Sequence, residues 1–285
     1  MYVKYKLRKS SNLVTPKGPS FASAQTIRCD FDGSVLSFNA PKHRPYYKRV
    51  KEYQPERHYN KNDIPRYFRC YDNDNHETPN HLEYYHLFRR YWTFYGPWFT
   101  GTLAQLSMHI TLIKPTNFEH EFSLYHPRAF EKLVGDYLTY INAEHINDDG
   151  SFHYTTPVNW QPLTHLATVA AQLDVIPNKG AYTDDKTRHL FFTLSDQIMA
   201  SVRFETSRWP NIGKEKLDKL VSEDSMIELM NNIIDSFKLT LSDEAKQQQQ
   251  AALAGLDDTS LIKKYPPLDW SDLTSEQNTN IKKLK

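Results

Sequence analysis

Two segments of the chain alternate strictly in the placement of their apolar residues. Apolar side chains occupy every second position from Leu106 to Leu112 and again from Ile198 to Phe204. Period two is typical of a β-strand, because successive side chains point to opposite faces of a sheet. The intervening positions are Gln105, Ser107, His109, Thr111, Met199, Ser201, Arg203 and Glu205. Both segments are therefore predicted to be strands with one buried face and one wetter face.

Each predicted strand is followed by a segment with helical periodicity. Counted from Phe130, apolar residues fall at i, i+3, i+4, i+7, i+8 and i+11, and the same positions are apolar when counted from Met226. This spacing places an apolar stripe along one side of a helix. Pro127 suits the first helical turn, where a missing N–H costs nothing. Ser222 or Ser225 can begin the second helix by accepting a backbone N–H.

The order of these elements predicts an α+β fold. Asp32-Gly33 lies between two alternating runs, and both residue types tolerate the positive φ of a type I′ hairpin turn. A turn followed by an aromatic-x-x-Pro phrase leads to Pro41 and again to Pro157. With the matching helices, this suggests a duplication into two similar modules, each an antiparallel sheet packed by a closing amphipathic helix; coincidence of common patterns is the alternative. The predicted boundaries are 1–146, with a basic aromatic insertion at about 42–100, then 147–245, and a helical or extended C-terminal tail at 246–285.

The amino-acid composition limits the classes of protein to which this chain can belong. The 285 residues are 39% hydrophobic, which is far too apolar for a disordered chain. No run approaches the ~18 apolar residues of a membrane span, and the basic start at Met1 is not followed by the apolar stretch of a secretory signal. Cys29 and Cys70 are too few for a disulfide framework or a cysteine-based zinc site. We therefore expect a soluble cytoplasmic protein with reduced thiols and no membrane partner.

The net charge of +1 conceals a strong asymmetry. Residues 1–71 hold 15 Lys and Arg against 5 Asp and Glu, whereas the rest of the chain holds 20 against 29. Twelve of the 18 tyrosines also precede residue 100. Three interpretations stay open: the two regions neutralise one another across an internal interface, the basic region meets an acidic protein, or it meets nucleic acid.

The insertion is the leading candidate for a binding surface, because insertions on a repeated scaffold often carry function. Its segment from Arg44 to Arg69 interleaves cations with tyrosines. The candidate partner-binding residues are Arg44, Tyr46, Tyr47, Lys48, Arg49, Arg66, Tyr67 and Arg69. The aromatic stretch that follows, from Tyr84 to Phe99, is predicted instead to pack as core or as a subunit interface.

A search for reaction chemistry finds no motif. His76, His81 and His86 recur every five residues, which on a helix rotates each by about 140° and prevents convergence on one ion. The residues from Asp72 to Glu83 are similar to a calcium loop, but Glu77 stands where that loop requires glycine for a sharp turn. Nucleophile-elbow and phosphate-loop motifs are absent, and the chain has only 9 glycines. We therefore expect no catalytic residue, no metal site, no cofactor and no enzymatic activity.

Nucleic-acid binding has a single argument in its favour. Lys and Arg interleaved with tyrosines between Arg44 and Tyr53 could offer phosphate contacts and stacking faces. The acidic remainder of the chain would repel a long polyanion, and no recognised nucleic-acid module is present. Nucleic acid is therefore not expected as a partner.

Part of the chain resembles a known group of proteins. Four segments carry the resemblance: Arg188 to Phe204, Ile233 to Ser242, Pro19-Ser20-Phe21 and the Phe38-x-x-Pro41 phrase. They are similar to bacterial proteins encoded beside type VI secretion toxins, most strongly over residues 185–245. Such proteins are commonly immunity proteins, which bind and neutralise a cognate toxin in the producing cell. The shared motifs are structural, so the resemblance implies no catalytic residues.

The sequence hypothesis is therefore a two-module immunity protein that occludes the active site or substrate path of a cognate effector toxin. An inhibitor needs a stable scaffold and a charge-complementary surface, so the effector is expected to present an acidic contact surface to the basic insertion. Two alternatives stay open. One is an adaptor or chaperone that loads an effector for secretion, and the other is an unrecognised hydrolase whose residues assemble only in space.

Overall fold

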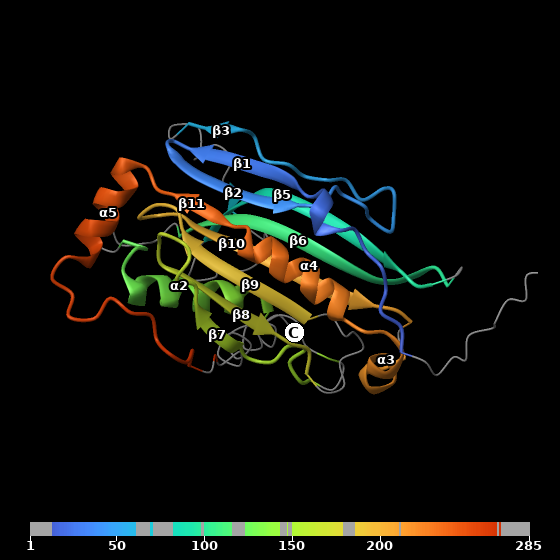
Figure 1. The fold of residues 1–285 in the computed structure, drawn as a ribbon. Coiled ribbons are helices and arrows are strands. Elements are labelled where there is room, and N and C mark those ends of the chain that lie inside the picture. Colours follow the sequence, from blue (N-terminus) through green and yellow to red (C-terminus); the bar gives the residue numbers. More distant parts are fainter. Residues whose placement is uncertain are drawn as a thin grey trace, which may run out of the picture.

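Strands from both halves of the chain form one large antiparallel sheet, on which a smaller sheet packs (Figure 1). The computed structural model describes residues 13–60, 69–70, 82–97, 100–115, 123–142, 147, 150–178, 186–210, 212–266 and 268. The strands are β1 (Gln25–Phe31), β2 (Ser34–Ala40), β3 (His58–Tyr59), β4 (Arg69–Cys70), β5 (Leu82–Tyr95), β6 (Thr102–Pro115), β7 (Val158–Pro162), β8 (Ala170–Val175), β9 (Lys186–Thr193), β10 (Met199–Arg208) and β11 (Lys238–Thr240). The helices are η1 (Phe21–Ser23), α2 (Pro127–Asn142), α3 (Lys214–Leu220), α4 (Asp224–Asp235) and α5 (Asp243–Leu253). The fold is α+β, as predicted.

The two strands predicted from their alternation are β6 and β10, and they are neighbours near the centre of the large sheet. Its strand order is β4-β5-β6-β10-β9-β8-β7. The central pair is antiparallel, with Ile110 opposite Val202 and Met108 opposite Phe204. The sheet therefore runs across the predicted module boundary at residue 146. The internal duplication is not confirmed.

The predicted hairpin is present in the small sheet, whose order is β11-β2-β1-β3. Asp32 and Gly33 occupy the turn with φ values of 51° and 91°, the positive φ that a two-residue type I′ turn requires. The Oδ1 atom of Asp30 accepts the Gly33 N–H at 2.7 Å and closes the turn. β11, which follows α4 in the chain, pairs with β2. The second half of the chain thus completes the sheet that the first half begins.

One face of the large sheet packs against the small sheet and α4. The apolar positions predicted for both central strands point into this core. Helix α4 contributes the buried residues Met226, Leu229, Met230, Ile233 and Ile234. Burial of a side chain of this size contributes about 1.5–3 kcal/mol. The helix begins at Asp224 with Glu223 as its N-cap, so of the two predicted starts Ser222 lies just before the cap and Ser225 lies inside the helix. Ser222 Oγ accepts the Asp224 N–H at 3.0 Å.

The opposite face of the large sheet packs against α2, so the two helices lie on opposite sides of the sheet (Figure 1). Pro127 is the first residue of α2, and the predicted apolar stripe is buried apart from Ile141, which is partly buried. The chain after α5 returns to this layer, where the Ile262 N–H donates to Glu131 Oε1 at 2.7 Å and Trp160 Nε1 donates to the Ile262 carbonyl at 2.8 Å. Within the described residues, no helix is long and apolar enough to cross a bilayer.

The aromatic stretch at the end of the insertion forms most of β5, and four of its described side chains pack as core, as predicted, whereas Tyr85, Tyr91 and Tyr95 are partly buried. Tyr84, Phe88, Trp92 and Phe94 are all less than a tenth exposed. Only the first of these faces α2, and the other three face the small sheet. β5 is therefore part of the scaffold, and the candidate surface lies in the residues before it.

Arg90 of β5 is a charged residue buried in the core between the two sheets, with 1% exposure. Its Nη1 donates to the carbonyls of Ala40 at 3.0 Å and Pro41 at 2.8 Å, and its Nε donates to a carboxylate oxygen of Glu52. Trp92 Nε1 also donates to the Pro41 carbonyl, at 3.1 Å. These contacts hold the chain that leaves β2 against β5.

Replacing this buried cation should destabilise the protein. Arg90→Met is expected to lower the free energy of unfolding by about 3 kcal/mol, because it removes the Arg90 donors from the Glu52 carboxylate and the Ala40 carbonyl and leaves the Pro41 carbonyl with Trp92 Nε1 alone. Urea unfolding at neutral pH measures the change. Arg28→Met, at an exposed position of β1, serves as the control and should stay within about 0.5 kcal/mol of the parent protein. Equal stabilities of the two variants would contradict the role given to Arg90.

Candidate functional site

Residues 43–53, named here the basic–aromatic loop, run along the edge of β5. Near its start Arg44 pairs with Trp92, and at its end Tyr53 and Arg89 exchange two backbone hydrogen bonds of 2.9 and 3.0 Å. Because β4 pairs with β5 at only two positions, these contacts supply partners for part of the edge that β4 leaves unpaired. The loop is therefore held by the scaffold at both ends.

The middle of the loop turns outward. The Val50 N–H donates to the Tyr47 carbonyl at 3.0 Å and closes a tight turn. Tyr46 is 48% exposed and Tyr47 is 66% exposed, and their ring centres are 4.5 Å apart. Lys48 and Arg49 are also exposed. A fixed turn that presents tyrosines offers large contact area at low entropic cost.

Two features of the loop connect it to the rest of the structure. The guanidinium of Arg44 lies 5.0 Å from the centre of the Tyr95 ring, at the end of β5, so this cation packs against the scaffold. The Tyr46 ring lies 5.9 Å from the ring of Trp209, which directly follows β10. Trp209 was missed by sequence reasoning, because no local pattern links it to the loop.

The structure brings together five of the eight predicted partner-binding residues. Those that lie in the loop are Arg44, Tyr46, Tyr47, Lys48 and Arg49. Arg66 and Tyr67 lie outside the described residues. Arg69 belongs to β4, where its backbone pairs with Tyr84. The candidate surface is therefore built on the first part of the predicted segment.

A second polar cluster lies on the face of the large sheet that also packs against α2. Four side chains from adjacent strands β5, β6, β10 and β9 stand directly opposite one another across the sheet, and we name them the Arg–His row: Arg89, His109, Arg203 and His189. Directly paired positions place Cβ atoms about 4.5–5.5 Å apart. Arg203 Nη2 also lies 3.5 Å from Glu205 Oε2. The row therefore concentrates two guanidinium groups and two imidazoles.

The row is continuous with the basic–aromatic loop. The Tyr91 N–H donates to His43 Nδ1 at 3.1 Å, and the two rings are 6.1 Å apart. The Tyr91 ring is in turn 5.5 Å from the ring of His109. At the end of the row, Arg89 Nη2 donates to the Lys51 carbonyl at 3.3 Å. The two features thus share β5 and meet at its edge.

Burial and nearby cations keep the imidazoles of the row neutral. Burial lowers the pKa of His109 from 6.5 to about 3, and the charges of Arg203 and Arg89 add to this effect. Burial, with the charge of Arg203, likewise lowers the pKa of His189 to about 3. A neutral imidazole carries one N–H donor and one acceptor nitrogen. The row therefore offers neutral donors beside its two permanent cations.

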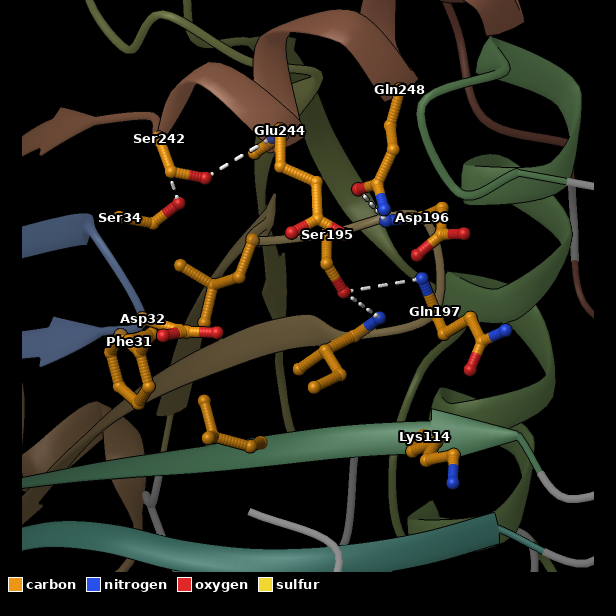
Figure 2. A pocket seen from close by; sticks show the side chains of 14 residues that line it. Phe31, Asp32, Ser34, Lys114, Ser195, Asp196, Gln197, Ser242, Glu244 and Gln248 are labelled. Atoms are coloured by element: carbon orange, nitrogen blue, oxygen red, sulfur yellow. Dashed lines mark hydrogen bonds between the residues drawn. The ribbon is translucent and has the colours of Figure 1, made fainter. Parts of the chain in front are cut away.

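A separate cavity of about 210 Å³ lies where the β1–β2 turn, the β9–β10 turn and α5 meet (Figure 2). Ser195 Oγ accepts the N–H groups of Gln197 and Ile198 at 3.3 and 3.1 Å. Ser242 Oγ caps α5 by accepting the Ala245 N–H at 3.2 Å. These hydroxyls stabilise a turn and a helix end, and no His or Cys is among the residues that line the cavity. Its lining therefore contains no nucleophile–base pair of the usual kind.

The described residues form no metal-binding cluster, and the Cys29 thiol is not ionised at neutral pH. Among the described residues, no three His, Cys, Asp or Glu side chains are grouped to hold a metal ion. His76, His81 and most of the calcium-like segment from Asp72 to Glu83 lie outside the described residues. Burial, with the charge of Asp30, raises the pKa of the Cys29 thiol to about 12. That thiol is therefore protonated at neutral pH.

Comparison with known proteins assigns no family. No protein-family model and no curated protein matches the chain. A crystal structure of the Ran-binding protein Mog1p from Saccharomyces cerevisiae is similar over 75% of this chain and 95% of that chain, with 9% sequence identity and a TM-score of 0.32. A similarity at this level carries no argument about function.

The neutral imidazoles predict a specific dependence of stability on pH. Below pH 6.5 the unfolded chain binds protons at positions that stay neutral in the folded protein, so the free energy of unfolding falls as the pH drops from 6.5 toward 3. For the fully buried His189 the expected loss at pH 5 is about 2 kcal/mol. Urea unfolding between pH 7 and pH 5, where most carboxylates stay ionised, measures this loss.

A matched pair of variants separates the row from the other titrating groups. His189→Gln should flatten the pH dependence, whereas His165→Gln, at an exposed position, should leave it unchanged. Arg89 and Arg203 within the row, and Glu205 and His86 beside it, are present in all of these proteins, so their contribution cancels in the comparison. Identical slopes for the parent and both variants would rule out a neutral, buried His189.

Proposed function

We propose that the chain is a non-enzymatic immunity protein that binds a cognate type VI secretion effector in the cytoplasm of the producing cell and occludes its active site. The observation that carries the binding step is the basic–aromatic loop, in which exposed tyrosines and cations are held on the edge of a large sheet. The effector as partner rests on the resemblance of residues 185–245 to proteins encoded beside such toxins.

The loop has the composition of a protein-binding surface. Tyrosine is enriched at interfaces because its ring supplies apolar area while its hydroxyl stays available for a hydrogen bond. Within the described part of the chain, neither Lys48 nor Arg49 forms an ion pair, and both are exposed. Their charge is therefore available to attract an acidic surface and to raise the rate of encounter.

The division between scaffold and surface also supports an inhibitor. The segment that resembles the immunity proteins contains β9, β10, α3, α4 and β11. Of these, β9, β10, α4 and β11 supply side chains to the core between the two sheets. The basic–aromatic loop lies outside that segment, at the edge of β5. A retained core with a separate contact loop allows the loop to match a particular effector while the fold stays the same.

Recovery of the partner and two genetic tests separate immunity from effector loading. Affinity purification of the tagged protein from its native cells, followed by mass spectrometry, should recover one protein in stoichiometric amount. Expression of that protein alone should be toxic, and co-expression with this chain should protect the cells. Deletion of this chain should leave secretion of the effector unchanged. A secretion defect without protection would assign the chain as an adaptor instead.

Charge reversal in the loop should weaken binding of the recovered partner. Lys48→Glu together with Arg49→Glu is expected to lower the affinity on the order of tenfold to a hundredfold, because two attractive contacts become repulsive. Biolayer interferometry with the purified partner measures the change. The melting temperature should stay close to that of the parent protein, since both side chains are exposed.

The control variant makes the same change of charge elsewhere. Arg28→Glu with Lys238→Glu alters two exposed residues of the small sheet, on β1 and β11. This variant should bind the partner as tightly as the parent protein does. Equal affinities of the loop variant and the control variant would remove the basic–aromatic loop from the proposed interface.

A further inference from the structure

The Arg–His row contains buried polar atoms that have no hydrogen-bond partner in the described part of the chain. These atoms are Arg89 Nε and His189 Nδ1. His189 is only 1% exposed. A buried polar atom that stays unpaired is destabilising, and the great majority of such atoms in folded proteins are paired. The row is therefore suited to a group that can pair with the N–H donor at Arg89 Nε.

The net charge of the Arg–His row determines which kind of ligand it can bind. Its two imidazoles are neutral, and its two guanidinium groups are permanent cations. Glu205 is the carboxylate paired with Arg203, through one contact of 3.5 Å. That distance is longer than the 2.7–2.9 Å of a charge-assisted hydrogen bond, so the N–H donors of Arg203 are not saturated by it. A net positive, donor-rich row favours an anion.

The spacing of the row allows two cations to act on one anion. Arg89 and Arg203 flank His109 on the two neighbouring strands, and adjacent strands lie about 4.7–4.9 Å apart. Long side chains reach across such a distance. The guanidinium groups can therefore approach one oxyanion from both sides, with the N–H of a neutral imidazole between them.

The row is also reachable from solvent. The side chain of Arg203 is 37% exposed and that of Glu205 is 32% exposed, whereas His189 is buried. One side of the row is thus open, and the other side lies against the sheet and α2. A partly buried position strengthens charge pairing relative to the exposed loop, because fewer water molecules screen it.

We infer that the Arg–His row is a binding site for a single oxyanion, a carboxylate or a phosphate, held between the guanidinium groups of Arg89 and Arg203. The site does not depend on the identity of any effector. Two sources can supply the same chemistry: a free small anion, or a carboxylate on a bound protein. The site lies beside the basic–aromatic loop, so either source has access to it.

The test follows the imidazole resonances of the full-length protein by NMR during titration with inorganic phosphate, and separately with succinate, at constant ionic strength set with chloride. The His109 and His189 resonances are assigned with His109→Gln and His189→Gln. We expect a saturating shift of the His109 resonance. Arg203→Gln should weaken the apparent affinity at least tenfold, and Arg28→Gln, at an exposed site on the small sheet, should not change it.

The outcomes are separable. A tighter response to phosphate assigns a phosphate ligand, and a tighter response to succinate assigns a carboxylate. N-acetylglutamate carries the carboxylate of an acidic side chain, so it then distinguishes a protein group from a free anion. A site for a protein carboxylate responds to N-acetylglutamate at least as strongly as to succinate. A shift that never saturates, or that is the same in Arg203→Gln as in the parent, reflects screening alone and overturns the site. If Arg203→Gln does not fold, Arg89→Gln decides between the same outcomes.

Discussion

The contact between the buried guanidinium of Arg90 and the chain leaving β2 holds that chain, and the basic–aromatic loop that follows it, against β5. The chain leaves the small sheet at Ala40 and Pro41, whose carbonyls turn toward the core and need donors. Arg90 and Trp92 provide those donors from one face of β5. A charge in such a core is costly unless it is paired, and Glu52, near the end of the basic–aromatic loop, pairs with it. Arg90 thereby holds the chain just before the loop and Glu52 near the end of the loop.

Local periodicity predicted the central elements because each of them buries one defined face. The alternation around Ile110 and Val202 predicted β6 and β10, and the apolar stripes from Phe130 and Met226 predicted α2 and α4. Periodicity does not say which strands pair, however, because pairing joins residues that are far apart in the chain. Each of the two predicted strand–helix units could have formed a sheet of its own, but their strands lie in one shared sheet. Similar stripes likewise could not show that the two helices lie on opposite faces.

The candidate site also has a part that the local sequence predicts and a part that it does not. Lys48 and Arg49 could be predicted from local composition, because their exposure in a turn does not depend on contacts with distant parts of the chain. Arg44 carries the same charge, yet it packs on Tyr95, a contact that depends on how the loop lies against β5. The Arg–His row depends wholly on register: His109 and Arg203 were visible as polar positions of two predicted strands, but their alignment arises only when those strands pair.

The loop and the row meet different requirements for recognising an acidic group. Cations on an exposed loop act over distance and are screened by salt, so they affect the rate of encounter more than the final affinity. Partly buried donors act only at contact, and they stabilise an oxyanion that is correctly placed. Tyr91 connects the two, because its N–H is bound by His43 and its ring packs on His109. Since both surfaces are attached to β5, the contact of Arg90 with Glu52 helps to keep the loop beside the row.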